Sequence, residues 1–195
     1  MATTRLIRGG NVSLTKMEPA LEKVIVGLGW SARPTSSTAE FDLDASAFLL
    51  SDYGKVRGDH DFVFYNQLAS PCGSVVHSGD VRVGAGSGDD ETITIELSRL
   101  PRDIVRIAFC VTIHEAEARN QNFGMLERSH IRVVNGITGH EMVRYDLTED
   151  AGVETAMIFG EIYRYRGEWK FRAVGQGYRG GLGALAESFG VEVLY

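Results

Sequence analysis

Short runs of apolar residues, separated by glycine-rich turns, recur along this chain and constrain its fold most strongly. In the run 41–50, Leu43, Ala45, Ala47 and Leu49 alternate with more polar residues, which is the period of a strand with one buried face. The run 104–113 is almost continuously apolar and predicts a central strand that is buried on both faces. Many short strands at a spacing of roughly 8–12 residues predict a β-sandwich.

The expected elements cover most of the chain. We expect strands over 10–14, 24–30, 41–50, 62–66, 75–77, 92–97, 104–113, 131–134, 141–147, 155–165, 169–174 and 191–194. Short helical segments are expected over 114–121 and 184–189, and Asn135-Gly136 predicts a hairpin turn. No repeat or linker divides the 195 residues, and this length suits a single core. The sequence therefore predicts a mostly β, single-domain β-sandwich over 1–195 with a few short helices.

Negative charge is concentrated in one third of the chain. The net charge is −6, and residues 40–96 hold eleven acids and only three bases. Three acidic clusters there stand beside expected strands: Asp42 with Asp44, Asp59 with Asp61, and Asp89-Asp90-Glu91 after the glycines at 84, 86 and 88. Calcium takes roughly 6–8 oxygen ligands from carboxylates and backbone carbonyls. The clusters predict a metal site, and the alternative is that each is an ordinary solvated face.

Several other site types do not fit. An EF-hand loop that starts at Asp42 has Ala47 at its glycine position, and one that starts at Asp59 has Val63 at its fifth position. The five histidines lack zinc-site spacing. Two cysteines 38 positions apart form no disulfide framework, and no signal peptide or membrane span is evident. We expect a cytoplasmic protein without membrane insertion.

The segment 163–172 alternates aromatic and basic residues. If rings and charges point to opposite faces of a hairpin, the rings enter the core and the cations are solvated. This arrangement and the overall acidity predict no nucleic-acid binding. The alternative is an anion or nucleic-acid site that uses Arg164, Arg166, Lys170 and Arg172.

Taken together, several stretches resemble the tellurium-resistance TerD family of bacterial stress proteins. They are Gly9-Gly10-Asn11-Val12-Ser13-Leu14, Val26-Gly27-Leu28-Gly29-Trp30, Phe41-Asp42-Leu43-Asp44-Ala45-Ser46, Asp61-Phe62-Val63-Phe64-Tyr65-Asn66, Gly79-Asp80 with Gly88-Asp89-Asp90-Glu91, Arg144-Tyr145-Asp146-Leu147-Thr148-Glu149-Asp150, Glu154-Thr155-Ala156-Met157 and 167–177. These segments are spread over nearly the whole chain, and their combination is specific.

The resemblance implies a β-sandwich that binds Ca²⁺, about two ions, and acts in resistance to tellurite and other chemical stress and in phage and colicin tolerance. It implies partners among other Ter-type proteins, in a complex near the membrane, and no enzymatic activity. The implied ligands are Asp42, Asp44, Asp59, Asp61, Asn66, Asp80, Asp89, Asp90 and Glu91.

The chain departs from the family pattern at Ser31, Gln67, Val81, Ala85 and Ser87. We expect the lost oxygen donors to weaken one calcium site without abolishing binding. A metal-dependent hydrolase that uses the same carboxylates is the alternative function.

Overall fold

The computed structural model describes residues 2–32, 41–79, 88–147 and 152–192, which form two facing β-sheets. The strands are β1 (Thr4–Leu6), β2 (Asn11–Ser13), β3 (Lys23–Ala32), β4 (Leu43–Leu50), β5 (Phe62–Val63), β6 (Val75–His77), β7 (Glu91–Glu96), β8 (Arg106–Ile113), β9 (Leu126–Asn135), β10 (Glu141–Asp146), β11 (Ala156–Tyr165) and β12 (Glu168–Tyr178). The helices are α1 (Leu14–Met17), α2 (Ala116–Arg119) and α3 (Gly181–Ser188), with short 3₁₀ turns at Asp59–Asp61, Leu97–Arg99 and Phe123–Met125.

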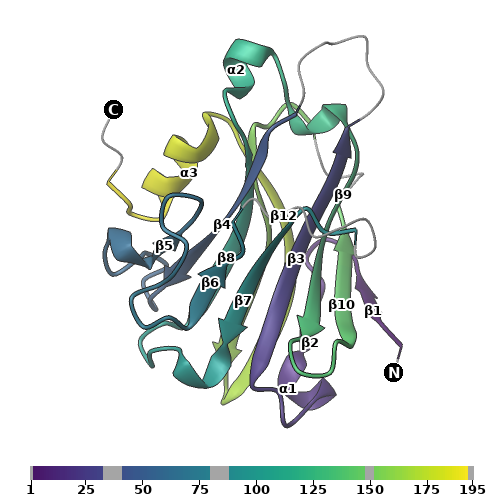
Figure 1. Cartoon of the computed structure of the whole chain (residues 1–195), viewed down its shortest axis with the longest axis vertical. Coiled ribbons are helices and arrows are strands. Elements are labelled where there is room, and N and C mark those ends of the chain that lie inside the picture. The colour runs from purple at the N-terminus through teal and green to yellow at the C-terminus, as the bar shows by residue number, and fades with distance from the viewer. Residues whose placement is uncertain (1, 33–40, 80–87, 148–151, 193–195) are drawn as a thin grey trace.

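Sheet A has the strand order β1-β10-β9-β3-β7-β6, and sheet B has the order β2-β12-β11-β8-β4-β5. Strand β1 runs parallel to β10, and the other pairings between these strands are antiparallel. Helix α2 lies at one end of the two layers and α1 at the other (Figure 1). The predicted mostly β sandwich with a few short helices is confirmed.

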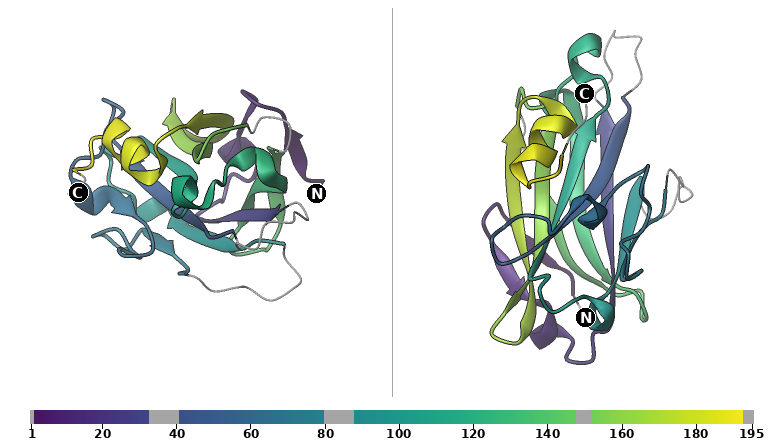
Figure 2. Two further views of the ribbon diagram at one scale, coloured as in Figure 1. Left: turned by 90° about the horizontal axis from the view of Figure 1, so that it is seen from above. Right: turned by 90° about the vertical axis from the view of Figure 1, so that its left-hand side faces the viewer.

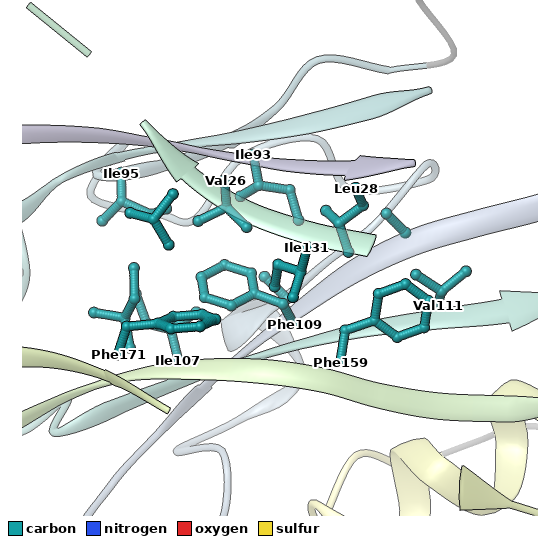
Figure 3. Packing of buried hydrophobic residues seen from close by; sticks show 14 of the residues in the cluster. Val26, Leu28, Ile93, Ile95, Ile107, Phe109, Val111, Ile131, Phe159 and Phe171 are labelled. Carbon is teal, nitrogen blue, oxygen red and sulfur yellow. The ribbon is translucent and has the colours of Figure 1, made fainter. Parts of the chain in front are cut away.

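The core lies between the sheets. Val26, Leu28 and Ile93 of sheet A face Phe109 and Phe159 of sheet B, as Figure 3 shows, and all five are fully buried. Burial of one such side chain contributes about 1.5–3 kcal/mol. Strand β8 is buried on both faces beyond Arg106, as its apolar run predicts, because a second cluster covers the outer face of sheet B.

That second cluster lies under α3. Phe48 and Cys110 of sheet B pack with Leu185 and Ala186 of the helix, and the edge-on view shows α3 against this sheet (Figure 2, right). The helix covers only the part of the outer face near α2. Both cysteines are free thiols, in agreement with the absence of a disulfide framework.

Element boundaries differ from the sequence prediction where side chains redirect the backbone. The expected strand 10–14 stops at Ser13, because the Ser13 hydroxyl accepts the Lys16 N–H at 3.0 Å and caps α1. The parallel strand β1 is missing from the sequence prediction. Residues 136–140 replace the expected two-residue turn between β9 and β10. Of the expected last strand, Val191 and Glu192 are not strand residues, and 193–195 lie outside the described residues.

The hairpin of β11 and β12 bears out only half of the prediction that its rings enter the core. Phe171 and the partly buried Trp169 of β12 pack against the core, but the two tyrosines of β11 share the outer face with cations. Tyr163 pairs with Lys170, and directly paired residues of adjacent strands share a face. Tyr165 accordingly contacts the ammonium of Lys170, and Tyr163 contacts the guanidinium of Arg172. Alternation along one strand separates rings from charges, but cross-strand pairing brings them together.

Two hydrogen bonds to the Glu18 carboxylate fix the loop after α1 against the β9–β10 turn. Nδ1 of His140 donates to the Glu18 carboxylate at 2.7 Å, and the Asn135 amide donates to its other oxygen. Burial opposes ionisation of Glu18, but these hydrogen bonds outweigh it and hold the pKa of Glu18 below its ordinary value. The ionised carboxylate therefore stabilises the folded state.

We expect Glu18→Gln to lower the free energy of unfolding at pH 7 by about 1.5–3 kcal/mol, the usual range for a hydrogen bond to a charged group. Because the folded-state pKa is depressed, this contribution is complete above the unfolded-state pKa and is lost as the pH falls through the folded-state pKa. Urea unfolding of both proteins between pH 3 and pH 7 checks this. A difference that does not shrink in acid contradicts it.

Candidate metal site at the α2 end of the sandwich

Asp42 and Asp44 lie where β4 begins, at the end of the sandwich that carries α2. Asp44 pairs across the sheet with Thr112 of β8, and the backbone N–H of His114 bonds to the Asp42 carbonyl at 2.8 Å. Asp42 is exposed and Asp44 is half-buried. The period of two along the strand places both carboxylates on the face opposite Leu43 and Ala45.

Glu91, the first residue of β7, joins the two sheets beside Asp44. Its Oε2 accepts the backbone N–H of Ala45 at 2.6 Å and lies 3.2 Å from Nε2 of His77. Nδ1 of His77 accepts the N–H of Gly79 at 2.9 Å, so Nε2 carries the proton and donates to the Ala45 carbonyl at 3.1 Å. Glu91 and His77 thus satisfy the open edge of β4, which β5 covers only at Ala47 and Phe48.

The carboxylate of Asp44 is the least compensated charge at this rim. It accepts no hydrogen bond and forms no ion pair within the part of the chain that the structure describes. Burial, with the nearby carboxylates of Glu91 and Asp42, raises the pKa of Asp44 to about 6, and His114 and His77 only partly oppose this. A cation at this position would offset the repulsion between Asp44 and the nearby carboxylates, and it would give the Asp44 oxygens a partner.

Asp89 turns away from this rim, onto the outer face of sheet A. Its oxygens accept from Nε and Nη2 of Arg132 at 2.7–2.9 Å and from Nε2 of His130 at 3.2 Å. Burial disfavours its charge, but His130 and Arg132 outweigh that and hold the pKa of Asp89 below its ordinary value. The carboxylate lies over Gly27, where a Cβ would come within 2.2 Å of Oδ2, so a glycine is required there.

Asp90 takes a third direction. Its Oδ2 accepts the backbone N–H of Trp30 at 2.7 Å, and its own N–H bonds to the Leu28 carbonyl at 2.8 Å, which extends the contact between β3 and β7. The three consecutive acids therefore point in different directions. Asp89 points to the outer face of sheet A, Asp90 to the backbone near the end of β3, and Glu91 to the space between the sheets. Of these three residues, Glu91 is the one whose charge contributes to the raised pKa of Asp44.

Asp59 and Asp61 lie beside the other end of β4. Phe62 pairs with Phe48, which places Asp61 roughly 16 Å further along the strand than Asp44 at ~3.3 Å per residue. Asp61 is fully buried, and both of its oxygens accept from Arg57 at 2.7 Å. Asp59 is exposed and accepts the backbone N–H of Glu192 at 3.1 Å. Of the three acidic clusters, the structure thus brings Asp42 and Asp44 together with Glu91 alone of the 89–91 cluster.

The remaining predicted ligands are Asn66, which is exposed at a tight turn closed by the bridge between Phe64 and Gln67, and Asp80, which lies outside the described residues. Among the side chains that are described, no three His, Cys, Asp or Glu residues already form a metal-binding group. Calcium at this rim would therefore recruit backbone carbonyls, water or residues beyond the described ranges, as its coordination commonly does.

A cavity of about 480 Å³ adjoins the rim. Asp44, Tyr65 and Thr112 line it on the sheet side, and His114 and Glu115 line it on the α2 side. Glu115 has a φ of 50°, in the left-handed region that non-glycine residues rarely adopt. The strand end, α2 and the first residues of α3 thus border an open hollow that Asp44 and Glu115 line with carboxylates.

These features define a two-sheet sandwich with an acidic rim at one end, and comparison with known proteins gives its family. The chain matches the TerD domain over residues 1–189, and it belongs to the TerD family. It is 58% identical to tellurium resistance protein TerD of Serratia marcescens over 95% of this chain and 96% of that protein. It is 52% identical to general stress protein 16U of Bacillus subtilis (strain 168), over 98% and 99% of the two chains.

A solved structure gives the same fold. A homologue of telluride resistance protein (TerD) from Streptomyces coelicolor A3(2) superposes with a TM-score of 0.65 at 26% identity, over 89% of this chain and all of that chain. In the described ranges, none of the helices has the length and apolar character that a membrane-crossing segment needs.

Sequence reasoning missed the partners of the carboxylates more than the carboxylates themselves. Arg57 stands four residues before Asp61, a spacing that signals a local ion pair. The sequence gives no such signal for Arg132 or His77. Arg132 is brought to Asp89, and His77 to Glu91, by the pairing of their strands in sheet A. His77 proves to be a buried residue that bonds the backbone of β4, as a lone histidine beside a strand often does.

Proposed function

We propose that the rim formed by Asp42, Asp44 and Glu91, with Asp90 beside it, binds Ca²⁺. The observation that carries this is the half-buried carboxylate of Asp44, which faces other carboxylates and has no donor among the described residues. A divalent cation supplies the missing positive charge, and hard oxygen ligands of this kind suit calcium. Asp80 would join from outside the described residues, and the expected number of about two ions is part of the proposal.

The chain would act as a calcium-binding module in resistance to tellurite and other chemical stress, in the cytoplasm and without enzymatic activity. The names of its relatives, which include tellurium resistance and general stress proteins, support the stress-resistance role. Other Ter-type proteins, in a complex near the membrane, are the proposed partners. Bound calcium would fix the start of β4 against β7, so the rim would present one defined surface to them.

Calorimetric titration of the metal-stripped protein tests the site. We expect Asp44→Asn to weaken calcium binding at least tenfold, because the amide keeps the shape but loses the charge. Asp59→Asn is the matched control, since it removes one exposed carboxylate from the other end of β4, and we expect it to leave the affinity unchanged.

Absence of heat with Ca²⁺ at millimolar concentrations would reject the proposal. A loss in Asp59→Asn with none in Asp44→Asn would move the site to the other end of the strand. Turnover of a phosphoester or ester that disappears in Asp44→Asn would favour a metal-dependent hydrolase instead.

A further inference from the structure

The outer face of sheet B bears a cationic surface with two tyrosines, on the part that α3 leaves uncovered. Its members, here called the tyrosine surface, are Arg106, Tyr163, Tyr165, Arg166, Lys170 and Arg172. Tyr163 pairs with Arg106 on one side and with Lys170 on the other, so the strand register places these side chains on one face. Tyr165 is 49% exposed, and Arg166 and Arg172 are exposed as well.

Each ring of this surface is next to at least one cation. The guanidinium of Arg166 lies 5.2 Å from the Tyr165 ring centre, and the ammonium of Lys170 lies 5.4 Å from it. The guanidinium of Arg172 lies 5.9 Å from the Tyr163 ring centre. At such distances the contacts are weak where solvent is present, about 0.5–1 kcal/mol each, so a ligand can replace them.

Positive charge exceeds negative charge on this surface although the whole chain is acidic. Two carboxylates lie on this face beside four cations. Glu161 is buried and binds Arg172 at 2.5 Å and Arg106 at 3.6 Å. Glu168 pairs with Tyr165 and forms an ion pair with Lys16 at 3.2 Å. Arg166 and Lys170 form no ion pair within 4.0 Å in the described part of the chain, although the charge of Lys170 acts on Glu168. The rim of Asp42 and Asp44 lies at the opposite end of β4, because Leu50 rather than Asp44 pairs with Arg106.

We propose that the tyrosine surface binds single-stranded nucleic acid. Tyr163 and Tyr165 are two residues apart on one strand, so their side chains are about 6.6 Å apart, a step that suits neighbouring bases of an extended strand. Bases stack on such rings without sequence preference, while Lys and Arg bind the phosphates. The cations that now lie over the rings would move to the phosphates as bases replace them.

A nucleic acid suits this surface better than an anionic membrane does. None of the members of the tyrosine surface is an aliphatic side chain that could enter a lipid layer, and the surface is part of a sheet rather than an amphipathic helix. The expectation of no nucleic-acid binding rested on the overall acidity and on rings and cations that lie on opposite faces. The strand register contradicts the second ground for Tyr163 and Tyr165, and the excess of cations on this surface opposes the first.

Fluorescence anisotropy with a labelled oligo-thymidine of about twelve nucleotides, at several salt concentrations, tests the proposal on the full chain. We expect Tyr165→Leu, which keeps an apolar side chain but removes the ring, to weaken binding at least fivefold. We expect Lys170→Ala to weaken it and to reduce the slope of log affinity against log salt by about 0.7, the value for one phosphate contact on a single strand.

Arg128→Ala is the matched control, because it removes one exposed cation from sheet A, and we expect it to bind like the unmodified protein. Circular dichroism confirms that each variant is folded. No binding at low salt, or an equal loss in Arg128→Ala, would overturn the proposal. Binding to vesicles of anionic lipid that depends on Tyr165 and Lys170, with none to the oligonucleotide, would overturn it as well and assign the surface to membranes.

Discussion

An Arg132→Met variant is expected to lose about 3–5 kcal/mol of stability, because it leaves the buried carboxylate of Asp89 without its counter-charge. Only 4% of the Asp89 side chain is exposed, and Arg132 supplies three of the hydrogen bonds to it. Methionine keeps most of the volume, so the loss would report the charge rather than a cavity. His130 remains beside Asp89 but is a single donor at 3.2 Å.

Urea unfolding followed by tryptophan fluorescence measures this effect. Glu141→Gln is the matched control, since Glu141 is the other carboxylate on Arg132, at 2.9 Å, and its side chain is 25% exposed. We expect that variant to lose no more than about 1 kcal/mol. Equal losses in the two variants would show that Asp89 does not depend on Arg132 for its charge balance.

An Arg57→Ala variant is expected to lose a similar 3–5 kcal/mol, because Asp61 is fully buried and Arg57 contacts both of its oxygens. Asp103 binds the same guanidinium at 3.0 Å but is exposed, so Asp103→Asn is expected to cost far less stability than Arg57→Ala. Because Arg57 has one buried and one exposed partner, the Asp103 variant serves as the control for the Arg57 variant.

Thermal unfolding with and without Ca²⁺ distinguishes a structural role of Asp61 from a role as a calcium ligand. If Asp61 serves the Arg57 pair, millimolar Ca²⁺ would shift the thermal midpoints of the unmodified protein and of Arg57→Ala by the same amount. A much larger shift in Arg57→Ala would mean that calcium takes the place of Arg57 on Asp61. That result would extend the metal site to the second end of β4.

Much of the fold follows from the sequence, because it depends on local periodicity. The alternating run of β4 and the apolar run of β8 each became a strand close to its predicted bounds. The short strand β1 could not be predicted from the sequence, because three residues are too few to show a hydrophobic period. Its partner β10 also lies about 140 residues away in the chain. Predicted strand ends were wrong where a side chain ends the strand, as the capping hydroxyl of Ser13 does.

The candidate site is less predictable, because proximity in sequence misleads there. Asp89, Asp90 and Glu91 are consecutive, yet they point in three directions, and each has a different partner. Asp44 and Glu91 are far apart in the chain, yet the charge of Glu91 contributes to the raised pKa of Asp44. Acidic clusters show where charge accumulates, while the arginines that neutralise some of it become visible only with the strand register.

An anomalous-difference map from a crystal soaked in calcium, recorded at a long wavelength, would locate the ion itself. Our proposal predicts a peak about 2.3–2.6 Å from a carboxylate oxygen of Asp44, close to Glu91. A map without a peak there, or with its only peak beside Asp59 and Asp61, would contradict it.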